Sequence, residues 1–253
     1  MDELEVQPAA ETAPGLSQWQ RVSNTFTAPS KTFEDIRRGN KSWWLPLIIL
    51  SLAGYIFFAA VSQKIGMQQV VDNQVHMSAK GQERMAQLTP EQRANSNRIS
   101  IAITRGVFLG GPAIGLIVIA VLSLVLLGTI NFIFGGRASY SSIFAVYYYA
   151  YLPSVIKVLL GVVVVYVGIA PESFNIKNFA PTNIGAFLDP MDTNKALYAL
   201  ATSIDAITIW TLVLLSIGIA AVAGVKRSSG YMAVFGWWAI VVLVGVAAAV
   251  VFG

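Results

Sequence analysis

The chain has 253 residues, of which 55% are hydrophobic and only 12% are charged, and its formal net charge is +4. A soluble domain carries about 25% charged residues, so a chain this apolar could not cover its surface in water. We therefore expect an integral membrane protein, with lipid surrounding most of the chain. There is no cysteine and one histidine, which excludes disulfides, thiolate metal sites and a cysteine nucleophile.

The N-terminal segment lacks the basic start and the continuous apolar run of a secretory signal peptide. We expect residues 1–20 to form a disordered tail and residues 21–253 to form a single membrane domain. Phe26 and Phe33 belong to two apolar faces with helical spacing, separated by Pro29. This spacing predicts two short amphipathic helices at the headgroup level before the first span.

In that interfacial position the aromatic side chains would enter the membrane as anchors. The alternative is a short polar lead-in with a few buried aromatic side chains. The interfacial hypothesis also predicts that the basic residues of this segment bind lipid phosphates. These basic residues are Arg21, Lys31, Arg37 and Arg38.

Five apolar stretches are long enough to cross a bilayer, which takes about 20 residues as a helix. The chain is therefore predicted to be an all-α integral membrane protein, a bundle of five transmembrane helices. Trp43 and Trp44 open the first span, and Tyr148 and Tyr149 lie near the start of the third, where we expect interfacial aromatic anchors. The predicted spans are about 43–61, 112–134, 142–169, 197–224 and 231–252.

The segment between the first two spans, about 62–105, is polar with apolar residues at helical spacing. Within it Thr89, Pro90 and Gln92 form a helix-start signal, an N-cap, a first-turn proline and a capping box. We expect an extramembrane helical hairpin whose second helix continues into the second span. As the main structure outside the bilayer, it is the expected surface for a protein partner or for self-association.

The distribution of basic residues favours a cytoplasmic N-terminus, because several precede the first span and only Lys64 follows it closely. An odd number of spans then places the C-terminus on the opposite side. The basic residues before the first span are Lys31, Arg37, Arg38 and Lys41.

Two ionisable residues lie inside the predicted spans, Lys157 in the third and Asp205 in the fourth. At about 1.5 Å per residue their depths differ by less than a lysine side chain can reach, so the two are candidates for an intramembrane pair. Such a pair is either part of a polar path for an ion or a device that fixes helix packing. A proton relay usually needs several carboxylates, so we favour packing.

Small residues and prolines mark candidate packing sites and bends. Gly111 and Gly115 have the spacing that lets membrane helices approach closely. Pro112 follows a glycine pair before the second span, and Pro153 is expected to kink the third.

No motif for catalysis, cofactor binding or metal binding is present, such as GxSxG, HExxH or a phosphate-binding loop. We therefore expect no enzyme activity, no cofactor and no nucleic-acid partner. The lipid bilayer is the one partner that composition requires.

Four stretches resemble the bacterial branch of the Yip-type (Yip-one, Ypt-interacting protein) domain family. They are the entry segment from Asn24 to Ile36 followed by Trp43-Trp44-Leu-Pro46, then Tyr148–Pro153, Ser203–Trp210 and Gly218–Lys226. The resemblance implies five spans, a cytoplasmic N-terminus and a C-terminus on the other side. We expect the protein in the bacterial inner membrane. Eukaryotic relatives act with small GTPases, but the Asp-Leu-Tyr-Gly-Pro signature is missing here, so GTPase binding is not carried over.

Three functions remain, in order of preference. The first is a non-enzymatic membrane protein that organises membrane or recruits partners. The second is a small transporter or channel subunit that uses the polar site around Asp205 and Lys157. The third, an intramembrane enzyme, ranks last because no nucleophile–base pair is visible.

Overall fold

The computed structural model describes residues 15–252, and this part of the chain is helical with no β-strand. Within it, five helical segments are long and apolar enough to cross a membrane, as predicted. They are Trp44–Lys64, Gly111–Ile133, Tyr140–Val167, Ala206–Ala223 and Arg227–Val251. The predicted disorder of residues 1–14 lies outside the described residues.

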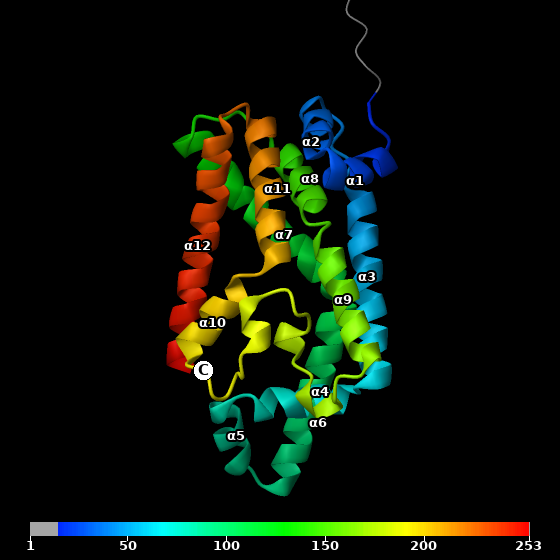
Figure 1. The fold of residues 1–253 in the computed structure, drawn as a ribbon, viewed down its shortest axis with the longest axis vertical. Coiled ribbons are helices and arrows are strands. Elements are labelled where there is room, and N and C mark those ends of the chain that lie inside the picture. Colours follow the sequence, from blue (N-terminus) through cyan, green and yellow to red (C-terminus); the bar gives the residue numbers. More distant parts are fainter. Residues whose placement is uncertain (1–14, 253) are drawn as a thin grey trace, which may run out of the picture.

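Three of the five spans are single α-helices, and other elements lie before, between and after the spans (Figure 1). The helices before the second span are α1 (Gln18–Thr27), α2 (Pro29–Arg37), α3 (Trp44–Lys64), α4 (Met67–His76), α5 (Ala79–Ala86) and α6 (Pro90–Leu109). The later helices are α7 (Gly111–Gly128) with the π-helical turn η1 (Thr129–Ile133), α8 (Tyr140–Ala150), α9 (Ser154–Val167), α10 (Lys195–Ser203), α11 (Ala206–Ala223) and α12 (Arg227–Phe252). Three 3₁₀ turns, η2 (Pro171–Ser173), η3 (Ile176–Asn178) and η4 (Ile184–Phe187), form the segment between α9 and α10.

Helix α11 lies at the centre of one half of the bundle, where it packs against α2, α8 and α12. The core of this half includes Phe33 and Ile36 of α2 and Ile143 and Ile219 of the spans. A second core lies toward the other end, where α3 packs on α9. The chain thus has one apolar core at each end of the bundle, and α2 belongs to the first.

The third span is broken at residues 151–153, between α8 and α9, and Pro153 is the N-cap of α9. Proline has no amide hydrogen for the helix and clashes with the preceding turn, so a break at this position follows from the sequence.

The fourth predicted span, 197–224, is not one helix. It is divided into α10 and α11, because Asp205 has an extended backbone (φ −116°, ψ 126°) and caps α11. Its Oδ1 accepts a hydrogen bond from the Thr208 amide at 2.8 Å. Aspartate favours N-cap positions over helix interiors, and apolarity alone did not reveal this break.

The segment 62–105 is helical, and the predicted helix start at Pro90 with its complete capping box is confirmed. However, the segment contains three helices and not a two-helix hairpin, since α4 and α5 precede α6. Helix α4 belongs to the bundle: Met67, Val70 and Val71 are buried. Helix α5 buries none of its residues.

The two ends of the bundle differ in what covers them (Figure 1). Helices α1 and α2 lie at one end, together with the start of α12. The α4–α6 segment, the loop between α9 and α10 and the end of α12 lie at the other.

Candidate functional site

A cluster of polar residues is buried where α1 and α2 meet the bundle. Arg21 of α1 is 1% exposed, and its Nε lies 3.6 Å from Oδ2 of Asp35 on α2. Burying an unpaired charge costs several kcal/mol, so such a residue needs partners from the protein. Asp35 supplies the opposite charge.

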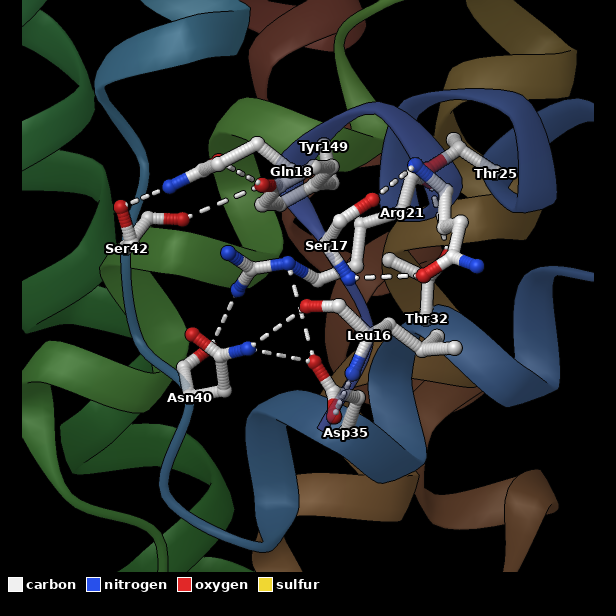
Figure 2. Close-up of polar contacts among 11 residues, drawn as sticks. Leu16, Ser17, Gln18, Arg21, Thr25, Thr32, Asp35, Asn40, Ser42 and Tyr149 are labelled. Carbon is white, nitrogen blue, oxygen red and sulfur yellow. Dashed lines mark hydrogen bonds and ion pairs between the residues drawn. The ribbon is translucent and has the colours of Figure 1, made fainter. Parts of the chain in front are cut away.

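Hydrogen bonds enclose this ion pair (Figure 2). Arg21 donates to the Asn40 carbonyl, and the Asn40 side-chain amide donates to Asp35 Oδ2 at 2.9 Å. The Leu16 amide donates to the other Asp35 oxygen at 3.0 Å. Asp35 therefore joins the segment before α1 to the linker after α2.

Tyr149 connects the same cluster to the membrane span α8. Its hydroxyl lies 2.7 Å from Oε1 of Gln18 and 3.2 Å from the Ser42 carbonyl. The Arg21 guanidinium stands over its ring, 5.2 Å from the centroid. A cation over an aromatic face is attracted by the ring quadrupole, so the contact fastens α1 to the third span.

A second polar site lies at the break between α10 and α11. Lys157 Nζ of α9 is 2.9 Å from Asp205 Oδ2, and Asp205 is 1% exposed. Thr182, from the loop between α9 and α10, also donates to Asp205 Oδ2. The carboxylate therefore binds one cation and one hydroxyl while it caps a helix.

The loop between α9 and α10 folds back to reach this pair. The Ala206 amide donates to the Thr182 carbonyl at 2.9 Å, and Asn183 forms an isolated antiparallel bridge with Asp205. The Phe179 ring centroid is 5.9 Å from Lys157 Nζ. The loop thus supplies both a polar and an aromatic partner.

Two cavities lined by described residues lie near the second site, and neither is lined by Lys157 or Asp205. No group of three or more potential metal ligands occurs among the described residues. Asp205 is buried, and the Lys157 side chain that pairs with it is 26% exposed.

The sequence was also compared with models of protein families. The model of the Yip1 domain matches residues 23–249. The chain belongs to the Yip1 domain family. The same sequence matches no curated protein and no solved structure. The match therefore begins within α1, two residues after Arg21, and covers α2, the α4–α6 segment and the spans up to residue 249.

Arg21, just before the matched residues, does not lie where its helical spacing predicted. It was expected on lipid phosphates, but it is buried against protein, because α1 and α2 pack on the bundle and not on lipid alone. One sequence signal shows that α1 starts before residue 21: Ser17 and Gln20 form its capping box. The helix therefore includes the last three residues of the predicted tail. Helical spacing alone could not show which surface covers α1.

The predicted aromatic anchors of the Yip1 domain divide into two groups. Phe33, Tyr148 and Tyr149 are at most 1% exposed and belong to the protein core, so they do not stand at the interface as expected. Trp44 is 51% exposed, and Phe26 is 37% exposed against the Trp210 ring.

Trp43 is half-buried between aromatic side chains of α8. Its ring stacks on Tyr148, with the centroids 5.3 Å apart, and meets the edge of Phe144 at 5.0 Å. This contact joins the start of α3 to the third span.

Of the predicted glycine and proline positions in the second span, Gly111 and Pro112 lie at the step from α6 to α7, and Gly115 lies within α7. Gly110 ends α6, and α7 begins at Gly111 with Pro112 in its first turn. Gly111 and Gly115 line a groove and do not form a close helix crossing, since a Cβ at either would meet nothing within 4 Å.

Outside the spans, the exposed face of α2 carries a second charge cluster. Hydrogen bonds from Arg37 and Arg38 hold the pKa of Glu34 down at about 2. Arg37 and Arg38 were predicted to bind lipid phosphates. Both side chains are exposed at this end of the bundle.

Proposed function

We propose that this Yip1-domain protein is a non-enzymatic membrane protein that recruits a protein partner. We place the contact on the tip, defined as residues 78–98, which comprises α5 and the first part of α6. The observation that supports this is that neither α5 nor α6 buries any residue within the chain. The tip is also the part that lies farthest from the bundle (Figure 1).

The other candidate contact surface is occupied by the chain itself. This surface is the amphipathic entry segment α1–α2, whose apolar face packs on α8 and α11. Phe33 and Ile36 are fully buried in that contact. A surface already used for packing within the chain is not free for a partner.

Transport along Lys157 and Asp205 is the alternative, and the geometry disfavours it. A transport path needs a hydrated or opening cavity beside its charged groups. Asp205 is 1% exposed and bound by Lys157, Thr182 and the Thr208 amide. We therefore assign the pair to packing.

The test uses single substitutions, because deletion of residues 62–105 would also remove α4. Asn73 of α4 donates to the carbonyls of Pro171 and Phe174, at 2.7 and 2.9 Å, and so holds the loop between α9 and α10. We propose a photo-crosslinking amino acid at Gln87, an exposed position at the end of α5. The matched control is the same amino acid at Leu243, which is 68% exposed on α12.

Partner recruitment predicts a discrete protein adduct at Gln87 in living cells, absent at Leu243. The adduct should disappear in Arg84→Glu, which reverses a charge on the exposed α5 surface while the bundle still inserts. An adduct of twice the mass of the chain would identify the partner as a second copy. If Gln87 gives no protein adduct, or gives the one seen at Leu243, the tip is not a recruitment surface.

A further inference from the structure

An apolar groove of about 600 Å³ runs between α3, α6, α7 and the third span. Its walls include Leu47, Leu50, Val107 and Ile119. Gly54 and Gly115 also line it and, having no side chain, leave space in the groove. This volume lies in the range of small-molecule and cofactor sites, about 300–1,000 Å³. Most of its lining residues belong to the first three membrane-spanning segments, so we expect lipid around that part of the groove.

The groove is open on the side that faces lipid. Four of its lining residues are 40–60% exposed: Tyr55, Ile103, Val107 and Tyr151. The hydroxyl groups of Tyr55, Ser51 and Ser154 donate to carbonyls of the chain, of Leu109, Leu47 and Tyr151 respectively. With these hydroxyls engaged, much of the wall offers apolar contact and suits a hydrocarbon chain.

One end of the groove is basic. Lys177, in the loop between α9 and α10, is the one charged residue that lines it. Lys64, which does not line the groove, ends α3, and its Nζ stands over the Tyr166 ring, 5.2 Å from the centroid. Among the ion pairs between described residues, none includes Lys177 or Lys64.

We propose that this groove binds one anionic phospholipid, from the leaflet at the α4–α6 end of the bundle. An acyl chain lies along α3 between Phe57 and Leu47, and the phosphate lies beside Lys177. At about 1.5 Å per residue, this stretch of α3 is roughly 15 Å long. Apolar contact holds the chain, and charge complementarity selects an anionic headgroup, since a basic residue near a membrane surface favours anionic lipid. This inference does not depend on partner binding by the tip.

Two glycines allow the groove to be filled without disturbing the fold. A Cβ at Gly54 or Gly115 would meet nothing within 4 Å, so Gly54→Leu and Gly115→Leu extend a side chain into open space. Leucine also favours the helix more than glycine does. Gly236 of α12 has the same open surroundings and does not line the groove, so Gly236→Leu is the matched control.

The purified full chain is placed in vesicles of phosphatidylcholine with a minor fraction of phosphatidylglycerol. The phosphatidylglycerol carries a photoreactive group on one acyl chain, and adducts are mapped by mass spectrometry. The wild type and Gly236→Leu should give adducts on the lining residues of α3 and α7. The adducts should be lost in Gly54→Leu and in Gly115→Leu.

The headgroup is tested in the same vesicles with the photoreactive chain on phosphatidylcholine. The wild type should prefer phosphatidylglycerol, and Lys177→Gln should lower that preference about fivefold, as expected for one basic residue near a membrane surface. Equal labelling of Gly54→Leu, Gly115→Leu and Gly236→Leu would overturn the proposal. So would a headgroup preference that Lys177→Gln leaves unchanged.

Discussion

At the scale of single residues, buried charges set how the helices are joined. Arg21 and Asp35 meet inside the protein, and their hydrogen bonds reach the segment before α1 and the linker before α3. Lys157 and Asp205 do the same for α9 and α11. A charge of this kind is costly alone and tolerated with its partner, so we propose that each pair specifies which elements meet.

Removing one member of the N-terminal pair should destabilise the bundle end. Arg21→Met leaves Asp35 buried without its cation, which costs about 3–5 kcal/mol for a buried pair. The double variant Arg21→Met/Asp35→Leu should recover part of that loss. Thermal unfolding in detergent measures both, with Arg37→Met as the control, because Arg37 makes its ion pair in solvent and little change is expected. Equal stability of Arg21→Met and Arg37→Met would refute the role of the cluster.

Removing the charge of Asp205 should likewise destabilise the contact between α9 and α11. Asp205→Asn keeps a side chain that can cap α11 but removes the charge beside Lys157, so we expect a loss of about 2 kcal/mol, typical of a hydrogen bond to a charged group. Adding Lys157→Met should relieve the loss. Unfolding measurements on the two single variants and the double variant give the coupling. If the losses simply add, the pair does not fix the packing of α9 on α11.

At the scale of elements, close packing explains why α2 is part of the bundle. A Cβ at Gly218 of α11 would lie 2.4 Å from Val146 and 2.9 Å from the Phe33 ring, so only glycine lets α2 and α8 approach α11. The helices of this end were predictable from apolar spacing and capping signals. Their packing partners were not, because spacing shows that a face is apolar and not which surface covers it.

Gly218 offers a direct test of this packing. Gly218→Ala should destabilise the protein by about 1–3 kcal/mol, the usual cost of overpacking a core. Gly236→Ala, where a Cβ meets nothing within 4 Å, should leave stability unchanged or raise it through helix propensity. Thermal unfolding of the two variants in one detergent compares them. The account of the α2 contact fails if Gly218→Ala is as stable as Gly236→Ala.

The breaks in the spans show how much of an element the sequence reveals. Pro153 predicted the step between α8 and α9, because a proline in the interior of a helical stretch removes a backbone hydrogen bond and clashes with the preceding turn. Asp205 was recognised as a buried charge, and its partner Lys157 could be proposed from depth. Its second role as the N-cap of α11 was missed, because the apolar run hid a local contact between Asp205 and the Thr208 amide. The partners Thr182 and Asn183 could not be predicted, because they come from a loop that folds back into the bundle.

At the scale of the whole molecule, the bundle has five spans, and its two ends carry different elements. Composition and span length predicted the five-span bundle, and the Yip1 domain match agrees with it. One end is closed by α1 and α2, and the other carries the tip and the basic end of the groove (Figure 1). Partner binding and lipid binding are both proposed for the second end, which gives the two ends different tasks.

The most direct test of this arrangement uses the absence of cysteine from the chain. Single cysteines at the exposed residues Ser30, Ser228, Ala86 and Ser173 can be labelled with a membrane-impermeant maleimide in sealed vesicles of known orientation. The five-span account predicts that Ser30→Cys and Ser228→Cys react from one side, and Ala86→Cys and Ser173→Cys only from the other. With a cytoplasmic N-terminus, the first two react in inside-out vesicles. Labelling of Ser30→Cys and Ala86→Cys from the same side would contradict the account.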